Sequence, residues 1–146
     1  MKVPNIGIIG SGSWATALAK LLLNNCLHIN WFIRSKTDID NFKQFGNNPK
    51  YLSSVDFEIS KINFTDSVRE CVQKSDYLIL AVPSAFLNDT FNAVQKSDLH
   101  NKVVFSAIKG IIPEYNLIVG EYLNTVYEIP LENIGVMTLV VYIKET

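Results

Sequence analysis

The sequence contains little cysteine, and the two cysteines that it has are far apart. Cys26 and Cys71 are the only cysteines among 146 residues. Two cysteines are too few for the disulfide framework of a small secreted domain, and their spacing matches no metal-binding pattern. We therefore expect two reduced, partly buried thiols, a reducing compartment and no metal site.

The chain also lacks an excess of charge of either sign. Its 13 Lys and Arg residues and 14 Asp and Glu residues give a net charge of −1. Proteins that bind nucleic acid usually present a broad basic surface, because contacts with phosphates supply much of the affinity. The balance of charges therefore argues against such a function, and we expect no nucleic-acid partner.

Long apolar runs are missing as well. No stretch approaches the roughly 18–20 apolar residues that a helix needs to cross a bilayer. Residues 1–5 do not begin an apolar segment with a small-residue cleavage site, as a signal peptide would. We therefore expect a cytoplasmic protein without a membrane span. The composition is that of a globular protein, 48% hydrophobic and 18% charged, and the length is typical of one domain.

Predicted strands and helices alternate along the chain. Short apolar runs predict strands at residues 6–9, 29–33, 62–64, 77–82 and 103–107. Apolar residues at helical spacing predict helices at residues 15–25, 38–45, 67–73, 86–94 and 115–126. Repeated strand–helix units predict an α/β fold with a doubly wound, mainly parallel sheet and helices on both faces.

The most informative segment joins the first predicted strand to the first predicted helix. Residues 10–15 read Gly-Ser-Gly-Ser-Trp-Ala and fit the pattern G-x-G-x-x-A. In a dinucleotide-binding fold, Gly10 would permit the tight turn, Gly12 would let backbone N–H groups approach a pyrophosphate, and the small Ala15 would let the helix pack on the strand. The sequence therefore predicts dinucleotide binding, and a glycine turn without a ligand is the alternative.

The end of the second predicted strand bears on the choice of dinucleotide. NAD-binding sites commonly have Asp or Glu there, which binds the ribose 2′-OH, whereas Arg accommodates the 2′-phosphate of NADP. This chain has Arg34, followed by Lys36, and its first acidic residue is Asp38. The pattern favours NADP, or the use of both NADP and NAD. A solvated charge at the strand end is the alternative for Arg34.

Two later strand ends are further candidates for chemistry. Ala-Val-Pro-Ser at residues 81–84 and Ser-Ala-Ile-Lys-Gly at 106–110 both lie at the carboxyl ends of predicted strands. Open α/β sheets bind ligands outside the carboxyl ends of their strands. Lys109 would there direct a cation toward a phosphate or a carbonyl group, with a solvated surface lysine as the alternative.

Five segments, taken in order, resemble the N-terminal domain of the bacterial type of NAD(P)-dependent glycerol-3-phosphate dehydrogenase. They are GSGSWATALA at residues 10–19, WFIR at 31–34, NPKYL at 48–52, AVPS at 81–84 and SAIKG at 106–110. The ordered match covers about residues 5–136. It implies a Rossmann-type NAD(P)-binding domain at residues 1–136.

The resemblance also implies roles for single residues. The residues implied to bind the cofactor, NADP or NAD, are Gly10, Ser11, Gly12, Ser13, Trp14, Arg34, Phe86 and Lys109. Trp14 would form a wall of the cofactor pocket, with a core aromatic as the alternative, and Phe86 would lie near the nicotinamide. Lys109 would contact both the cofactor and a small-molecule substrate, glycerol 3-phosphate or dihydroxyacetone phosphate.

The resemblance ends before the chain does. After Val136 the family continues into a helical domain that carries the proton-transfer lysine and most of the substrate site. Residues 137–146 do not match that pattern, so we expect the helical domain to be absent and the chain alone to be inactive, with no catalytic residue of its own. The apolar run at residues 136–143 would promote self-association if it extended the edge of the sheet.

In the full-length family, a hydride passes between the nicotinamide and C2 of glycerol 3-phosphate or dihydroxyacetone phosphate. The resemblance implies a homodimer and a place in glycerol-3-phosphate and phospholipid-precursor metabolism. The alternatives are a dinucleotide-binding module without turnover, a non-functional fragment, or a related Rossmann reductase such as a ketopantoate reductase. Lys109–Gly110 and the segment at residues 48–52 argue against the last of these.

Overall fold

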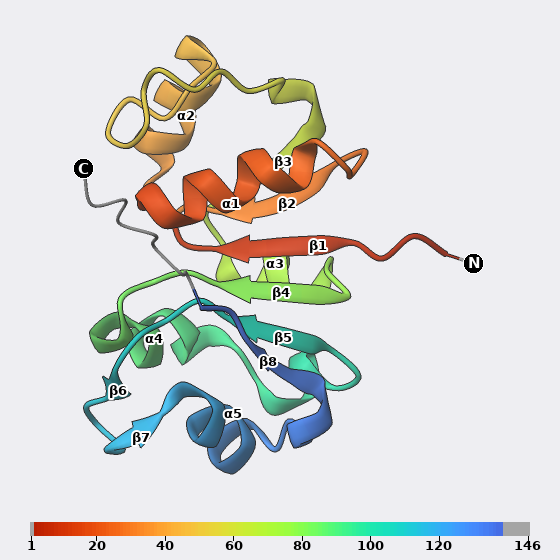
Figure 1. Ribbon diagram of the computed structural model, residues 1–146, viewed down its shortest axis with the longest axis vertical. Coiled ribbons are helices and arrows are strands. Elements are labelled where there is room, and N and C mark those ends of the chain that lie inside the picture. The colour runs from red at the N-terminus through yellow and green to blue at the C-terminus, as the bar shows by residue number, and fades with distance from the viewer. Residues whose placement is uncertain (1, 139–146) are drawn as a thin grey trace, which may run out of the picture.

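The main sheet has six parallel strands. The computed structural model describes residues 2–138. The strands of this sheet are β1 (Ile6–Ile9), β2 (Ile29–Phe32), β3 (Ile62–Thr65), β4 (Tyr77–Leu80), β5 (Val103–Ser106) and β8 (Ile134–Val136). Their order is β3-β2-β1-β4-β5-β8, and every neighbouring pair is parallel (Figure 1). The order reverses at β1, next to β4, which creates the crevice in which such sheets bind ligands.

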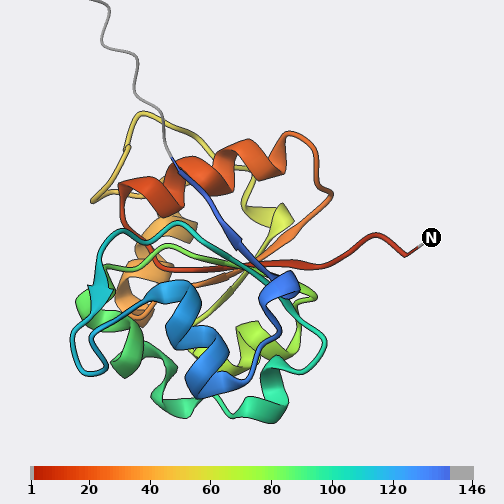
Figure 2. The same cartoon turned by 60° about the horizontal axis from the view of Figure 1, so that its bottom comes forward.

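Helices cover both faces of this sheet. They are α1 (Ser13–Leu23), α2 (Lys36–Phe45), α3 (Val68–Gln73), α4 (Ser84–Thr90) and α5 (Val119–Tyr127). Ile8 packs in one core cluster with residues of α1 and α2, whereas Ile9 packs in a second cluster with residues of α3, α4 and α5. Figure 2 shows α1 and α5 on opposite sides of the sheet. The predicted doubly wound fold is confirmed.

The predicted helix at residues 115–126 is wrong in its first third. Strands β6 (Ile111–Ile112) and β7 (Leu117–Ile118) form a small antiparallel hairpin, and α5 begins only at Val119. Asn116 has a φ of +53°, and its N–H donates to the carbonyl of Ile112 at 2.8 Å. A left-handed residue ends helical geometry, so the apolar spacing of this segment belongs to a hairpin followed by a shorter helix.

Several other element boundaries differ from the predictions. The strands predicted to end at residues 82 and 107 end at Leu80 and Ser106, and the helix predicted at 86–94 spans Ser84–Thr90, followed by a 3₁₀ turn at Phe91–Ala93. Strand β8 was not predicted. Of the apolar run at residues 136–143, the part from residue 139 onward lies outside the described residues, so its predicted self-association stays a prediction.

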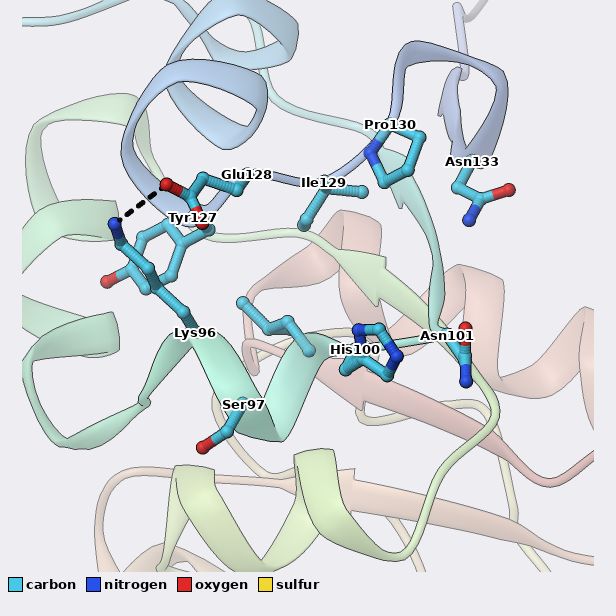
Figure 3. A pocket seen from close by; sticks show the side chains of 10 residues that line it. Lys96, Ser97, His100, Asn101, Tyr127, Glu128, Ile129, Pro130 and Asn133 are labelled. Atoms are coloured by element: carbon cyan, nitrogen blue, oxygen red, sulfur yellow. Dashed lines mark hydrogen bonds and ion pairs between the residues drawn. The ribbon is translucent and has the colours of Figure 1, made fainter.

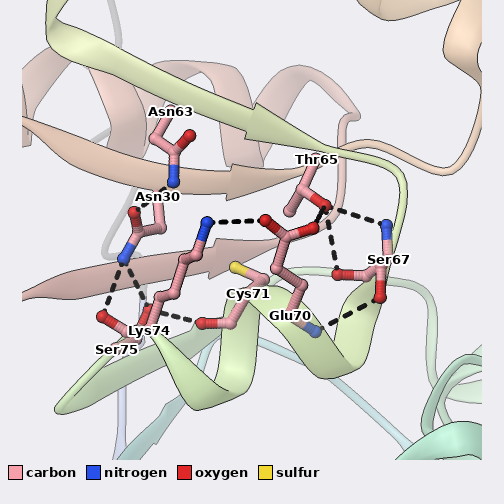
Figure 4. Close-up of polar contacts among 8 residues, drawn as sticks. All are labelled: Asn30, Asn63, Thr65, Ser67, Glu70, Cys71, Lys74 and Ser75. Carbon is pink, nitrogen blue, oxygen red and sulfur yellow. Dashed lines mark hydrogen bonds and ion pairs between the residues drawn. The ribbon is translucent and has the colours of Figure 1, made fainter.

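A buried asparagine fixes the register of the edge strand β3 (Figure 4). Asn30 in β2 is 5% exposed, and its Nδ2 donates to the carbonyl of Lys74 and to the hydroxyl of Ser75, each at 3.1 Å. Its Oδ1 accepts from Asn63 Nδ2 in β3 at 3.0 Å. A buried amide without partners is costly, so a shifted β3 would leave polar atoms unpaired.

Candidate functional site

The glycine turn, residues 10–12, joins β1 to α1 at the carboxyl edge of the sheet. Gly10 has a φ of +126°, and a Cβ added there would lie 2.3 Å from the carbonyl oxygen of Ala81. The close approach of the chain after β4 therefore requires glycine at position 10. A Cβ added at Gly12 would meet nothing within 4 Å, and its φ of −73° suits any residue. The described chain itself does not require glycine there, and the space beside it is open.

The first turn of α1 is open to an anion. Gly12 occupies the N-cap position and has no side chain, so no side-chain hydrogen bond caps the helix, and its first turn contains no acidic residue. The first N–H groups of a helix have no partner within the helix, and the helix dipole adds positive potential there. The glycine turn thus has the properties of a phosphate site.

Hydrogen bonds from the protein interior hold the carbonyl groups of the turn. Trp31 Nε1 donates to the carbonyl of Gly10 at 2.7 Å. Thr16 donates to the carbonyl of Gly12 through both its N–H, at 3.0 Å, and its hydroxyl, at 2.8 Å. These bonds fix the directions in which the carbonyl groups of Gly10 and Gly12 point.

A cavity of about 380 Å³ lies against the turn, within the size range of small-molecule sites. We call it the glycine-turn cavity. It is lined by Gly10, Ser11, Gly12, Phe32, Arg34, Tyr51, Ala81, Val82, Pro83, Phe86 and Thr90. The sheet thus brings the ends of β2 and β4 beside the turn, as its topology requires.

Arg34 and Phe86 meet at one end of this cavity. They also line a hollow of about 200 Å³ together with Phe32, Asp89 and Thr90. Phe86 is 54% exposed, and no ion pair within residues 2–138 includes Arg34. The guanidinium and an aromatic ring are therefore accessible to a ligand, with the Asp89 carboxylate at the same hollow.

Lys109 lies in a second cavity, of about 490 Å³, which we call the Lys109 cavity. It is lined by Ser13, Trp14, Ala17, Leu52, Ala107, Lys109 and Met137. Both cavities reach the start of α1, where Gly12 lines one and Ser13 lines the other. The structure thus places five of the predicted cofactor residues in the glycine-turn cavity and Ser13, Trp14 and Lys109 in the Lys109 cavity. It groups Phe86 with Arg34 rather than with Lys109.

Sequence reasoning missed two residues of this edge. Tyr51 lines the glycine-turn cavity. Asn48 is 6% exposed, and its side chain donates a hydrogen bond to the carbonyl of Ser11 in the turn. Both belong to the segment at residues 48–52, which contributed to the resemblance without a role for any single residue. A buried-asparagine role cannot be inferred from a loop sequence, because it depends on a contact between segments 37 residues apart.

A cavity of about 480 Å³ lies at the amino ends of the strands, opposite the candidate site (Figure 3). Its lining includes His100 and Asn101, which precede β5, and Pro130 and Asn133, which precede β8. The amino ends of parallel strands lie far from the glycine turn, so this cavity is separate from the candidate site. His28 is exposed, and its Nε2 lies 3.1 Å from Asn5 Oδ1, also near the amino ends of the strands.

Residues 2–138 contain no group of three or more His, Cys, Asp or Glu side chains that could hold a metal ion. In the same range, each helix is too short or too polar to cross a membrane.

Comparisons with known proteins agree with this geometry. A family model described as "NAD-dependent glycerol-3-phosphate dehydrogenase N-terminus" matches residues 5–138. A glycerol-3-phosphate dehydrogenase [NAD(P)+] of Mycoplasma mobile is 37% identical over 126 residues, which are 84% of this chain and 36% of that protein. A protein of the same name from Agathobacter rectalis is 30% identical over 132 residues, 90% of this chain and 38% of that protein.

Solved structures show the same fold. The glycerol-3-phosphate dehydrogenase of Coxiella burnetii superposes with a TM-score of 0.73 at 21% identity, over 84% of this chain and 37% of that one. The glycerol-3-phosphate dehydrogenase of Saccharomyces cerevisiae gives a TM-score of 0.72 at 18% identity, over 92% of this chain and 41% of that one. The chain thus spans well under half the length of the relatives it matches. The family match favours this family over the ketopantoate reductases, and the chain belongs to the NAD-dependent glycerol-3-phosphate dehydrogenase family, whose N-terminal region it matches.

Proposed function

We propose that this chain binds NADP or NAD at its carboxyl edge, across the glycine-turn cavity and the Lys109 cavity. The observation that carries the proposal is Gly12, because the described chain does not need a glycine there and the missing side chain leaves space beside an uncapped helix start. A pyrophosphate needs both the space and the N–H groups.

Each predicted site residue has a role in this proposal. The N–H groups of the glycine turn bind the pyrophosphate, and Arg34 pairs with a 2′-phosphate or with the adenosine end of the cofactor. Phe86 shares the cavity of Arg34, so we propose that its ring packs against the dinucleotide. Trp14 forms a wall of the Lys109 cavity, where Lys109 supplies a cation for a phosphate or a carbonyl group.

We propose that the whole protein interconverts glycerol 3-phosphate and dihydroxyacetone phosphate, because its relatives are named glycerol-3-phosphate dehydrogenase [NAD(P)+]. The bound nicotinamide supplies or accepts the hydride. The residues of this chain bind and orient the cofactor, and Lys109 binds the substrate. Because the chain spans 36–38% of those relatives, cofactor binding is what we propose for the chain itself. The domain boundary at residue 136, the homodimer and the cytoplasmic location stay predictions.

Calorimetric titration of the purified chain with NADPH and NADH tests this proposal. We expect a dissociation constant of about 10–100 μM for NADPH, or roughly −5.5 to −7 kcal/mol. Adenosine, which lacks the pyrophosphate, serves as the control and should bind far more weakly. The absence of both heat and a shift in melting temperature at millimolar NADPH and NADH would contradict the proposal.

A further inference from the structure

The side chain of Asn48 lies behind the glycine turn and uses its hydrogen-bonding groups there. Its Nδ2 donates to the carbonyl of Ser11 at 3.1 Å and to the hydroxyl of Thr16 at 3.0 Å. Its Oδ1 accepts from the N–H of Lys50 at 3.2 Å. The partners determine the orientation of the amide, because a carbonyl oxygen only accepts and a backbone N–H only donates.

Holding the carbonyl of Ser11 also aims an N–H group. The peptide bond between Ser11 and Gly12 is trans, and in a planar trans peptide the C=O and the N–H point in opposite directions. Asn48 pulls this carbonyl toward the interior, so the N–H of Gly12 is directed away from Asn48. Ser11 and Gly12 both line the glycine-turn cavity, whereas Asn48 does not.

The same residue places a second wall of the cavity. The N–H of Tyr51 donates to the backbone carbonyl of Asn48 at 3.3 Å, and Lys50 forms an ion pair with Asp38 at 2.9 Å. Tyr51 lines the glycine-turn cavity. Asn48 therefore connects two parts of the cavity wall that are far apart in the sequence, the turn and the loop that carries Tyr51.

We infer that Asn48 is a positioning residue for the pyrophosphate of the cofactor. It does not line the glycine-turn cavity, and it acts through the Ser11–Gly12 peptide, which it holds with the N–H outward. This inference rests on the proposed function. It adds that the affinity of the site for the pyrophosphate, but not for the adenosine 2′-phosphate end, depends on a buried amide behind the turn.

The test compares Asn48→Asp and Asn48→Ala with the unaltered chain by NMR titration of ¹⁵N-labelled protein. Both changes remove the donor to Ser11, and the aspartate also turns an acceptor toward that carbonyl. The ligands are ADP-ribose, which contains the pyrophosphate, and adenosine 2′-monophosphate, which lacks it. Asn47→Asp and Asn47→Ala are the matched controls, because among residues 2–138 the side chain of Asn47 donates only to the exposed carbonyl of Phe45, at 3.3 Å.

We expect both Asn48 variants to bind ADP-ribose at least tenfold more weakly and to bind adenosine 2′-monophosphate within twofold of the unaltered chain. The amide resonance of Gly12 should shift on addition of ADP-ribose in the unaltered chain and the Asn47 variants, but much less in the Asn48 variants. If Asn48→Asp does not fold, Asn48→Ala makes the comparison without a buried charge.

Two results would overturn the inference. One is unchanged affinity for ADP-ribose in the Asn48 variants. The other is an equal loss for both ligands, which would mean that Asn48 only supports the fold. If the unaltered chain binds neither ADP-ribose nor NADPH, the proposed function itself is wrong, and that result is distinct from either of the other two.

Discussion

The indole nitrogen of Trp31 donates a buried hydrogen bond to the carbonyl oxygen of Gly10 at 2.7 Å. Trp31 is fully buried, and its ring lies 5.2 Å from that of Phe42 and 5.8 Å from that of Phe57, centroid to centroid. A residue at the centre of the aromatic core thus holds the first residue of the glycine turn. Core packing and the geometry of the proposed cofactor site are therefore coupled through one bond.

Replacing Trp31 with Phe tests this coupling. The change leaves the Gly10 carbonyl without its donor and creates a cavity, so we expect a loss of about 2–4 kcal/mol in the free energy of unfolding. Urea denaturation measures it. Trp14→Phe is the control, since Trp14 is only half-buried and should lose much less. Equal losses of stability for the two variants would contradict this prediction.

The two glycines of the turn should respond to substitution in different ways. Gly10→Ala places a Cβ 2.3 Å from the Ala81 carbonyl at a positive φ, so we expect it to cost at least about 2–3 kcal/mol of stability. Gly12→Ala meets no protein atom and should cost less than about 1 kcal/mol. Its methyl group would instead occupy the space of the pyrophosphate and weaken NADPH binding.

Thermal unfolding and calorimetry with NADPH, measured on both variants, separate these effects. A folded Gly12→Ala variant with unchanged NADPH affinity would contradict the role proposed for that position. A Gly10→Ala variant as stable as the unaltered chain would contradict the close contact with Ala81, which follows β4.

Arg34 and Asp89 should have opposite effects on the choice of cofactor. If Arg34 pairs with the 2′-phosphate, Arg34→Ala should weaken NADPH binding by about 1.5–3 kcal/mol and NADH binding by much less. Asp89 lines the same hollow, and its carboxylate has the same sign of charge as the 2′-phosphate. Asp89→Asn removes this repulsion and should strengthen NADPH binding about two- to fivefold at low salt. Calorimetry with both cofactors measures this. Equal losses of NADPH and NADH affinity in Arg34→Ala would mean that Arg34 does not recognise the 2′-phosphate.

Asp98 should make stability depend on acidic pH. Burial tends to raise the pKa of its carboxyl, but hydrogen bonds from the Gln95 N–H, Gln73 and Arg69 outweigh burial and lower the pKa below its usual value. The folded state therefore binds the proton less readily than the unfolded state does. The resulting stabilisation is present above the unfolded pKa of about 3.9 and is lost as the pH falls through the lower, folded value.

Asp98→Asn should accordingly flatten the fall in stability between about pH 5 and pH 2, while lowering stability at pH 7. Urea denaturation at a series of pH values measures the slope. An unchanged slope in the variant would show that Asp98 does not contribute to the acid sensitivity.

The two cysteines should differ in reactivity. Cys71 is fully buried, and burial raises the pKa of its thiol to about 12. Thiolates are the reactive form, so Cys71 should stay unreactive toward a thiol reagent at pH 8. Cys26 is only half-buried. We expect one rapidly labelled thiol per folded chain and two in urea, with Cys26→Ser abolishing the fast reaction. Rapid labelling of two thiols in the native chain would contradict the packing around Cys71.

Local patterns in the sequence determined the fold class and the place of the site. A buried parallel strand appears as a continuous apolar run, and a covering helix repeats its apolar residues every three or four positions, so the α/β alternation is visible within short windows. The glycine turn is also local, because Gly10, Gly12 and Ala15 lie within six residues. Arg34 and Lys109 could be assigned to the same edge because the carboxyl ends of parallel strands meet there.

Only the tertiary structure decided the features that depend on distant partners. Strand β8 has three residues, one of them glycine, and is recognisable as a strand only through its pairing with β5. The apolar spacing at residues 115–126 runs through β7 into α5. The left-handed Asn116 and the pairing of β7 with β6, which the spacing does not reveal, delay the start of the helix to Val119.

The contacts inside the candidate site also depend on residues that are distant in the sequence. That Phe86 lies with Arg34 rather than with Lys109 follows from how the strand ends and α4 pack. The donors from Trp31 to Gly10 and from Asn48 to Ser11 join segments 21 and 37 residues apart. Sequence periodicity reports which face of an element is buried, whereas the partner of a buried polar group depends on how the elements pack together.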